Sequence, residues 1–307
     1  MDIWRDPRRH SCWSPQFAIF ILLNLSALVY WNFKLDNLIC SGQHPSVSER
    51  MLRKRDTGSA SSTNAAGPRI FCMINHKAGN KARAKAVQAT WARRCDGYTF
   101  ASTRSVPGAS TILIARNESR QVIWAKVQAM IRYADGIRDD FDWFIKTDDD
   151  TYVIVENLRH FLQARSPTEP VYIGTELAKE IPGGYLSGGA GYVFSRKAIE
   201  LLRRGFDRDV CNFTDTWMEE VPLEECARKV GVHHDGETLD DLGRARFLPH
   251  NPKVHFTPGN ENLLGWLKYS LGHHRNCCSD SAISFHYVTP INMYIYDYLI
   301  YNLKPHR

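Results

Sequence analysis

The sequence predicts an α/β domain built around a largely parallel sheet. Short apolar strands alternate with helices from about residue 68 onward, a pattern typical of repeated βαβ units. An acidic triplet, Asp148-Asp149-Asp150, follows one of these strands after Lys146 and Thr147, and a segment with five glycines, residues 183–194, precedes a later helix. Ligands of open α/β sheets bind beyond the carboxyl ends of the strands, so both features fall where a functional site is expected.

The first half of the domain supplies most of this alternation. Runs of aromatic and β-branched residues predict strands, and apolar residues at three- and four-residue spacing predict helices. In chain order we expect a strand over 69–74, a helix over 81–91, strands over 98–101 and 111–115, a helix over 119–133 and a strand over 141–145 that leads to the triplet.

The second half continues with a helix over 153–164, a strand over 171–174 and then the glycine-rich segment. Ser195 is a good N-cap for a helix through Arg204, and Gly205 is expected to end that helix. The five glycines allow the backbone to approach a ligand closely. The alternative is that they serve only turns and bulges.

The triplet is a candidate site for a hard divalent cation. Three adjacent carboxylates repel one another unless positive charge lies among them, and oxygen ligands suit such a cation. The alternative is a solvated acidic turn in which an Asp caps the next helix. Lys146, two residues before the triplet, either pairs with it or with a phosphate, or only balances the local charge.

The N-terminal part predicts a membrane anchor. Residues 17–33 are strongly apolar, although short for a span, which needs about 17 to 25 residues. Arg5, Arg8 and Arg9 precede the stretch and favour a cytoplasmic N-terminus. The alternative is a cleaved signal peptide, but no small-residue cleavage site follows closely. We therefore expect a cytoplasmic tail over 1–16, a transmembrane signal anchor over 17–33, a luminal stem over 34–67 and one luminal folded domain over 68–307.

Charge and cysteine content narrow the class of protein. About half of the formal charge of +6 belongs to the tail and stem, so the folded domain offers no case for nucleic-acid binding. Six of the eight cysteines lie in that domain, an even number that suggests disulfides in the lumen. A zinc site is the alternative, although no C-x-x-C spacing supports it. Cys72–Cys95 and Cys211–Cys226 are plausible local pairs, which leaves Cys277–Cys278 as a vicinal pair.

Two further features fit a luminal domain. Asn117 and Asn212 lie in N-glycosylation sequons that are usable there. Cys40 in the stem could link two chains into a homodimer, yet nothing in the sequence demands it.

Four segments occur together in an order that closely resembles the core 1 β1,3-galactosyltransferase family, also called T-synthase. The resemblance covers about residues 69–303, and the adjacent cysteines and the Phe-His-Tyr sequence make it more specific than an acidic motif alone. The segments are KARAKAVQATWARRC (81–95), WFIKTDDDTYV (143–153), YLSGGAGYV (185–193) and CCSDSAISFHYV (277–288).

The resemblance implies a GT-A glycosyltransferase fold behind a single N-terminal transmembrane helix, in a type II Golgi membrane protein. It implies inverting transfer of galactose from UDP-galactose to the 3-hydroxyl of GalNAc on Ser or Thr. A Mn²⁺ ion would bridge the two phosphates and act as a Lewis acid. The implied partners are GalNAc-modified glycoproteins, and a dedicated chaperone is left open.

The resemblance also carries over particular residues. Asp148, Asp150 and His286 match the family's metal ligands, and Asp149 and Lys146 lie beside them in the nucleotide-sugar site. Judged without the resemblance, a histidine between Phe and Tyr is more often a satisfied core residue than a ligand.

The resemblance also implies a general base at the start of a later acidic segment. An inverting displacement needs a base for the acceptor hydroxyl and no covalent nucleophile. Glu220 stands where the family has the Asp of a Glu-Asp pair, and we assign it as the base. Glu224 replaces a family glycine and Pro222 interrupts the pattern, so the sequence departs from the family here. The alternative is a set of acidic residues at a solvated helix start.

The expected sugar pocket combines the glycine-rich segment with a later aromatic one. Aromatic faces stack on the apolar faces of sugars, although a core position for the tryptophan is an open alternative. The assigned substrate-binding residues are Tyr185, Ser187, Gly188, Gly189, Trp266 and Tyr269. Three other hypotheses remain: a β1,3-glycosyltransferase with another UDP-sugar or acceptor, a non-catalytic chaperone-like relative, and a luminal nucleotide-sugar phosphohydrolase.

Overall fold

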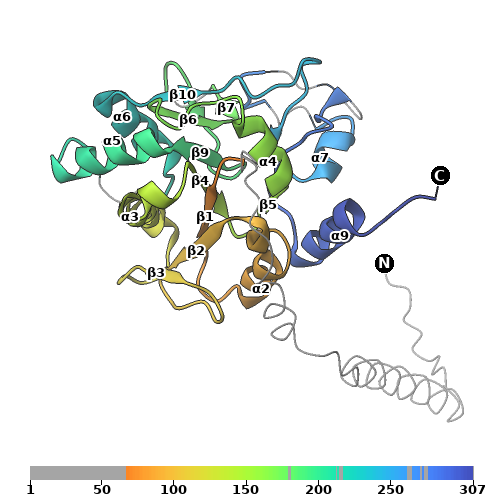
Figure 1. Cartoon of the computed structure of the whole chain (residues 1–307), viewed down its shortest axis with the longest axis horizontal. Coiled ribbons are helices and arrows are strands. Elements are labelled where there is room, and N and C mark those ends of the chain that lie inside the picture. Colours follow the sequence, from red (N-terminus) through yellow and green to blue (C-terminus); the bar gives the residue numbers. More distant parts are fainter. Residues whose placement is uncertain are drawn as a thin grey trace, which may run out of the picture. The chain divides into compact units, whose positions relative to one another are not determined.

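The computed structural model describes residues 67–178, 181–211, 213, 217–260, 265–269, 272 and 276–306 (Figure 1). The predicted tail, anchor and nearly all of the stem, together with Asn212, lie outside these residues. Within the described part, no helix has the length and apolar character needed to cross a membrane. The compact unit formed by Ala65–Arg307 contains every element described below.

A seven-stranded sheet forms the centre of the domain, in the order β10-β6-β9-β4-β1-β2-β3. The pairs β10–β6, β4–β1, β1–β2 and β2–β3 are parallel, whereas β9 runs antiparallel to both β6 and β4. The predicted α/β class with a largely parallel sheet is thus confirmed, with one reversed strand. The strands are β1 (Ile70–Asn75), β2 (Gly97–Ser102), β3 (Thr111–Leu113), β4 (Trp143–Asp148), β6 (Val171–Gly174), β9 (Tyr192–Ser195) and β10 (His233–Asp235).

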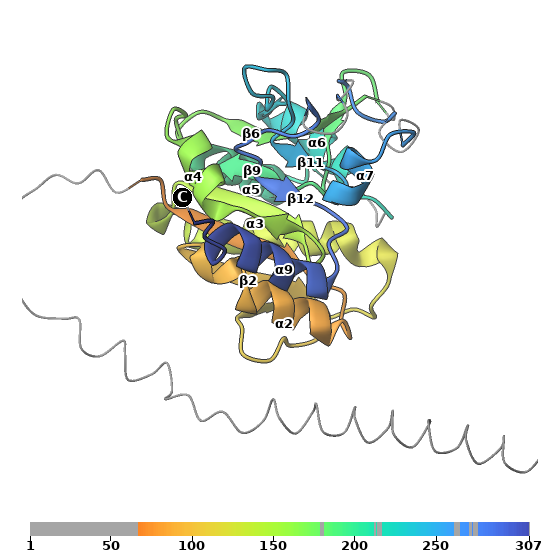
Figure 2. The same cartoon turned by 90° about the vertical axis from the view of Figure 1, so that its right-hand side faces the viewer.

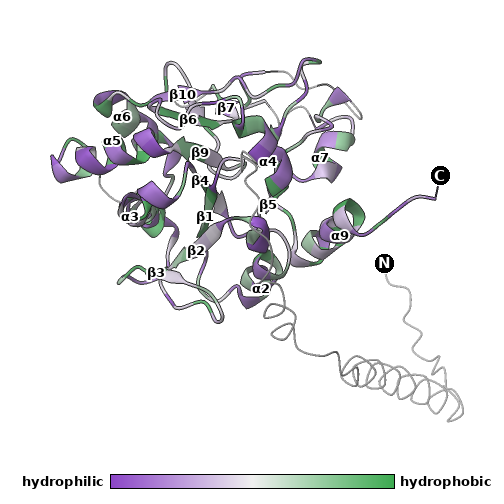
Figure 3. Ribbon diagram, viewed as in Figure 1, coloured by the Kyte–Doolittle hydropathy of each residue, from purple (hydrophilic) through white to green (hydrophobic). Residues whose placement is uncertain are grey.

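Helices cover both faces of this sheet, as Figures 1 and 2 show. Buried residues of α3, α5 and α6 belong to one apolar cluster, and buried residues of α2, α4 and α9 belong to the other. The central strands are largely green in the hydropathy colouring of Figure 3, and the outer surface of α5 is largely purple. The helices are α2 (Lys81–Ala89), α3 (Ile123–Gly136), α4 (Val155–Leu162), α5 (Arg196–Asp207), α6 (Glu220–Val230), α7 (Pro252–Phe256) and α9 (Pro290–Tyr301), with 3₁₀ turns η1 (Ala92–Arg94), η2 (Arg120–Val122) and η3 (Arg138–Asp140).

Strand β1 shows why the sequence folds in two layers. Ile70, Cys72 and Ile74 pack in the cluster with α2, while Phe71 and Met73 pack in the cluster with α3. Successive side chains of a strand point to opposite faces, so a continuous apolar run is buried on both sides. All five of these residues are at most 5% exposed.

A second, three-stranded sheet brings distant parts of the chain to the carboxyl end of β4. Its order is β11-β12-β5, and β12 runs antiparallel to β5, which directly follows the acidic triplet. Phe285 of β12 pairs with Tyr152 of β5, which places the next residue, His286, beside the triplet. The strands are β5 (Tyr152–Val153), β11 (Phe247–Leu248) and β12 (Ser284–Phe285), and β7 (Glu176–Leu177) forms a separate hairpin with β8 (Tyr185–Leu186).

The predicted start of helix α5 is confirmed, whereas its predicted end is wrong. Ser195 is its N-cap, as expected, because the Ser195 hydroxyl accepts a hydrogen bond from the Ala198 N–H. The prediction that Gly205 ends the helix is wrong, since α5 continues to Asp207. Gly205 serves packing instead: a Cβ there would lie 2.5 Å from Val230 Cγ1 and 2.8 Å from Cys211 Sγ. The missing side chain lets α5 lie close against the end of α6.

We expect Gly205→Ala to destabilise the domain by about 1–3 kcal/mol, because an extra methyl group has no room between two packed elements. Urea unfolding followed by circular dichroism would measure the change. Gly136→Ala is the matched control, since a Cβ at Gly136 would meet no atom of the described residues within 4 Å. Equal stabilities of the two variants would contradict the packing role.

All three predicted disulfides are present: Cys72–Cys95, Cys211–Cys226 and Cys277–Cys278. The first joins β1 to the residue after η1, and the second joins the residues beyond α5 to α6. The predicted helix over 119–133 begins as the 3₁₀ turn η2 before α3, and the helix over 81–91 ends at Ala89.

Candidate active site

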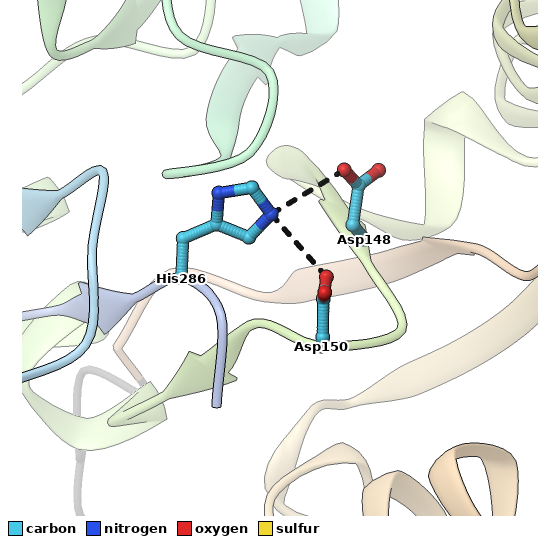
Figure 4. Close-up of side chains that lie close together, drawn as sticks. All are labelled: Asp148, Asp150 and His286. Carbon is cyan, nitrogen blue, oxygen red and sulfur yellow. Dashed lines mark ion pairs between the residues drawn. The ribbon is translucent and has the colours of Figure 1, made fainter. Parts of the chain in front are cut away.

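Two carboxylates and one imidazole converge at the carboxyl end of β4. His286 Nε2 lies 3.2 Å from Asp150 Oδ1 and 3.7 Å from Asp148 Oδ2 (Figure 4). One ligand atom from each of the three residues lies within 4.8 Å of the others. The Val288 N–H donates to the Asp150 carbonyl oxygen at 2.8 Å, which ties the strand of His286 to the triplet.

This set of donors fits a divalent cation. Carboxylate oxygens together with imidazole nitrogen suit Mn²⁺ and similar ions. The neighbouring backbone leaves room only because residue 189 is glycine: a Cβ there would lie 2.1 Å from His286 Cε1. The alternative of an Asp that caps the next helix is wrong, because the N-cap of α4 is Ile154 and the short strand β5 intervenes.

Asp149 belongs to a different set of contacts. Its carboxylate lies 2.7 Å from His76 Nδ1 and accepts hydrogen bonds from Arg83 at 3.0 Å and from the Lys77 N–H at 3.2 Å. Asp149 is 3% exposed, and it is outside the group of candidate metal ligands. It therefore holds the loop after β1 beside the site, and its expected contact with the nucleotide sugar stays a prediction.

Lys146 lies fully buried behind the acidic residues. Its ammonium group donates to Asp148 Oδ1 at 3.0 Å, to the Gly188 carbonyl oxygen at 3.2 Å, and to Glu219. Burial opposes a buried charge, but Asp148 and Glu219 outweigh it and raise the pKa of Lys146 above its usual value. Of the roles that the sequence left open, pairing with the triplet is the one observed.

The charge of Asp148 is stabilised in the same way. Burial alone would raise the pKa of this carboxyl group. The positive charge of Lys146, followed by the electrostatic interaction with His286, outweighs burial and lowers the pKa of Asp148 to about 2. The site thus keeps an ionised carboxylate at any physiological pH.

Glu219 and Glu220 stand at the start of α6 and play different parts. Glu219 is 1% exposed and pairs with Lys146, whereas Glu220 is half-buried and lines the cavity. Both carboxylates approach Gly188, where a Cβ would lie 2.2 Å from Glu219 Oε1 and 2.9 Å from Glu220 Oε1. Burial, and next the negative charge of Glu219, raise the pKa of Glu220 to about 8.

The acidic residues face a cavity of about 520 Å³. Basic side chains form part of its wall, and the buried Oδ1 of Asn75 has no hydrogen-bond partner among the described residues. A mixed wall of this kind suits a phosphorylated ligand bound with a cation. The lining of the cavity includes Asn75, Lys77, Arg83, Arg120, Glu220, Trp266 and Tyr287, together with the acidic triplet and His286.

The predicted substrate-binding residues are distributed unevenly. Ser187, Gly189 and Trp266 line this cavity, whereas the Gly188 carbonyl oxygen accepts a hydrogen bond from Lys146 and Gly188 packs against Glu219 and Glu220. Tyr185 is buried in β8 at 2% exposure, and Tyr269 lines a separate hollow next to Lys268. The cavity brings three of the six residues together, Gly188 contacts Glu220 of its wall, and the two tyrosines lie elsewhere.

Sequence reasoning missed several residues of the cavity wall. Lys77, Arg83 and Arg120 come from loops and helix ends that carry no motif of their own, although Arg83 lies within a segment noted for its resemblance. Tyr287, next to His286, has a positive φ of 54°, unusual for a residue other than glycine. Only that adjacency to a proposed ligand could have drawn attention to it.

We expect Gly189→Ala to weaken Mn²⁺ binding at least about tenfold, because the new methyl group must push the His286 ring away from Asp150. Isothermal titration calorimetry of the full chain would measure the affinity. Gly136→Ala serves as the control and should bind as the unchanged chain does. Wild-type affinity in Gly189→Ala would show that His286 is not a ligand.

Comparison with known proteins shows the family of this chain. A family described as Fringe-like matches residues 71–236. Glycoprotein-N-acetylgalactosamine 3-beta-galactosyltransferase 1 of Xenopus laevis is 36% identical over 245 residues, which cover 78% of this chain and 68% of the relative. These matches define the protein as a glycosyltransferase with a Fringe-like domain. The chain belongs to the core 1 β1,3-galactosyltransferase family.

More distant relatives carry other names. Human chondroitin sulfate synthase 3 is 29% identical over 249 residues, 66% of this chain and 28% of the relative. Mouse beta-1,3-glucosyltransferase is 27% identical over 176 residues, 56% of this chain and 35% of the relative. A solved glycosyltransferase involved in glycosylation of the major capsid of PBCV-1 covers 48% of this chain and 70% of its own, with a TM-score of 0.33 and 14% identity, too low to support an argument.

Proposed function

We propose that this protein transfers galactose from UDP-galactose to the 3-hydroxyl of GalNAc on Ser or Thr, with inversion and with a divalent metal ion. One observation carries the proposal: adjacent glycines separate two sets of functional groups in one cavity. Gly189 packs against His286 of the candidate metal site, and Gly188 packs against Glu219 and Glu220. A nucleotide-sugar site and a base for the acceptor therefore lie on either side of one short loop.

Each part of the site has a role in this reaction. Asp148, Asp150 and His286 would hold the cation, which when bound offsets the charge that develops on the leaving diphosphate. Lys77, Arg83 and Arg120 line the cavity and would bind phosphate oxygens.

Glu220 would accept the proton of the acceptor hydroxyl while the oxygen of that hydroxyl forms the new bond to C1 of galactose. The bond from C1 to the UDP oxygen breaks at the same time, and UDP leaves. A single displacement of this kind inverts C1 and needs no covalent enzyme intermediate.

The donor sugar is the part of the proposal that the relatives leave most open. The proteins named chondroitin sulfate synthase 3 and beta-1,3-glucosyltransferase align with much of the same domain. A related β1,3-transfer with another UDP-sugar is therefore the second candidate. A chaperone-like relative is less favoured, because all three candidate metal ligands and Glu220 are present.

We further propose a GT-A fold in a type II, single-pass membrane protein of the Golgi or early secretory pathway. Three disulfides and an exposed Asn117 within a sequon support an oxidising, luminal compartment. The acceptors would be GalNAc-modified glycoproteins. A homodimer and a dedicated chaperone remain proposals to be tested with the anchored chain.

An assay of the detergent-solubilised full chain tests the function. UDP-galactose, UDP-GlcNAc, UDP-glucose, UDP-glucuronic acid and UDP-GalNAc would be supplied with a GalNAc-Ser/Thr peptide, with and without Mn²⁺. The product linkage would be determined by nuclear magnetic resonance. We expect a β1,3-galactosyl product only with UDP-galactose and Mn²⁺. A product formed with another donor and not with UDP-galactose would favour the second candidate.

The rate of transfer should rise with pH up to about 8. The pKa of Glu220 lies above its ordinary value of 4.5, so the folded protein keeps this group protonated in a range where a base must be ionised. The unfolded chain loses this proton near pH 4.5 while the fold keeps it up to about pH 8, so the free energy of unfolding falls as the pH rises through this range. Measurement of kcat/KM from pH 5.5 to 9 tests the expected rise of the rate with pH. A profile that is flat from pH 6 to 8 would contradict this prediction.

A further inference from the structure

A second group of buried charges lies outside the metal site and centres on Glu224 of α6. Glu224 is 2% exposed. Its carboxylate accepts a hydrogen bond from Arg228 Nε at 2.6 Å and from the Tyr172 hydroxyl, and it lies 2.9 Å from His234 Nδ1. A buried carboxylate with three polar partners from α6, β6 and β10 fixes the helix against the sheet.

Arg228 forms the first arm of this group, by which we mean a set of polar contacts that leads from Glu224 to another segment, here the glycine-rich loop. Arg228 donates to the Pro182 carbonyl oxygen at 3.0 Å and to the Gly184 carbonyl oxygen at 3.1 Å. These residues lead directly into β8 and then to Gly188, which packs against Glu219 and Glu220. Arg228 thus connects Glu224 to the loop between the two halves of the active site.

The other arm reaches the segment that carries Trp266. His234 Nε2 lies 3.8 Å from Glu176 Oε1, and Glu176 Oε2 accepts a hydrogen bond from Lys268 Nζ at 2.8 Å. The backbone joins the same two segments, since the Lys268 N–H donates to Glu176 O at 3.1 Å. Trp266, two residues away, lines the reaction cavity.

Two glycines keep Glu176 in this place. A Cβ at Gly184 would lie 2.6 Å from Glu176 Oε1, and a Cβ at Gly236 would lie 2.5 Å from Glu176 Oε2. The carboxylate therefore occupies a slot that larger residues at these positions would fill. The group of charges runs from Lys268 through Glu176, His234 and Glu224 to Arg228; its two carboxylates are buried, whereas the Lys268 and Arg228 side chains at its ends are exposed.

Glu224 also lies one helical turn after Glu220. Residues four apart lie on the same side of a helix, so movement of the Glu224 anchor shifts the first turn of α6 and with it Glu220. The lining of the cavity includes residues of the glycine-rich loop, Trp266 and Glu220. Each of these three parts of the lining is connected to the Glu224 carboxylate. None of the candidate metal ligands belongs to this group.

We propose that Glu224 is a positioning residue for the transfer step: through Arg228 and through His234, Glu176 and Lys268 it sets the places of Glu220 and of the Trp266 segment around the acceptor. The inference rests on the proposed function for its kinetic readout. It assigns to Glu224 control of acceptor placement, separate from the binding of metal and nucleotide.

Glu224→Gln tests this with little change in shape. Removal of one charge from a buried group leaves Arg228 and His234 without their counterion. We expect kcat/KM for the acceptor to fall about 10- to 100-fold, since small misplacements of reacting groups cost this much. The dissociation constant of UDP in the presence of Mn²⁺ should change by less than about twofold, because its ligands lie elsewhere. Glu225→Gln, an exposed neighbour on the same helix, is the matched control.

Hydrogen exchange of the full chain, followed by mass spectrometry, gives a readout that does not depend on the substrate. Peptides that span 182–189 and 265–269 should exchange faster in Glu224→Gln than in Glu225→Gln. Lys268→Met breaks only the second arm and should raise the acceptor KM with kcat nearly unchanged. If Glu224→Gln does not accumulate as folded protein, Lys268→Met and His234→Gln carry the same comparison.

The outcomes separate the two proposals. Normal transfer and normal exchange in Glu224→Gln would overturn the positioning role while wild-type activity stands. A parallel loss of UDP binding and transfer would also overturn it, because that is the mark of general unfolding. If the unchanged chain transfers no sugar from any donor, the proposed function fails, and the exchange data alone decide whether Glu224 orders the cavity wall.

Discussion

Asp150→Asn is expected to lower metal-dependent transfer by about 10³-fold. A bound cation contributes several kcal/mol to the stabilisation of a leaving group's charge, and each 1.4 kcal/mol corresponds to a factor of ten in rate. Asp150 supplies one of three candidate ligands and lies 3.2 Å from both His286 and Arg83. The substitution keeps the shape of the side chain but removes the charge that attracts the cation.

Two measurements accompany the rate. Mn²⁺ affinity from calorimetry should fall together with activity, and far-ultraviolet circular dichroism should stay unchanged. Asp139→Asn is the control, because the Asp139 side chain is 91% exposed in η3. Wild-type turnover in Asp150→Asn would remove this residue from the metal site, whereas lost turnover with normal Mn²⁺ affinity would assign it a different role.

Glu220→Gln is expected to lower kcat by about 10²- to 10⁴-fold, the usual contribution of a general base. The amide cannot take the proton of the acceptor hydroxyl, although it fills the same space. UDP and Mn²⁺ should bind as before, because Glu220 lies on the other side of the Gly188-Gly189 loop from His286.

The stability of this variant gives an independent check. Because burial and Glu219 raise the pKa of Glu220, its ionised form is unfavourable in the fold, and a neutral amide should be no less stable at pH 9. Glu225→Gln is the control for charge removal on α6. Transfer at the wild-type rate by Glu220→Gln would mean that another group acts as base.

Much of the fold followed from local patterns. The apolar run over 69–74 predicted a strand, which the structure buries on both faces as β1, and Ser195 predicted the start of α5. The sequence left the cysteine pairing open among several possibilities, and the structure shows the two plausible local pairs and the remaining vicinal pair. The prediction for Gly205 was wrong because a glycine after a helical run is typical of a helix end. Only the short distance from Gly205 to Val230 in the structure shows that this glycine is needed for packing.

The sequence predicted which residues form the site better than it predicted how these residues are arranged in space. The triplet marked the end of a strand, and the resemblance supplied His286 and Glu220. The antiparallel pairing of β12 with β5 is what carries His286 to Asp150, and a short strand far along the chain gives no local sign of its partner. Tyr185 and Tyr269 looked equivalent to Trp266 in sequence, yet only Trp266 lines the cavity.

The sequence by itself determined the family, because four ordered segments that contain the carboxylate cluster, the histidine and the glycine-rich loop resemble it and survive as local motifs whatever their positions in space. Only the tertiary structure decided which partner and which role each carboxylate has. Asp149 binds His76 and Arg83, Asp148 pairs with buried Lys146, and Glu219 shields that lysine while Glu220 faces the cavity. The physical reason is that a carboxylate's role depends on which charges lie within a few ångströms of it, and those neighbours come from distant strands and helices.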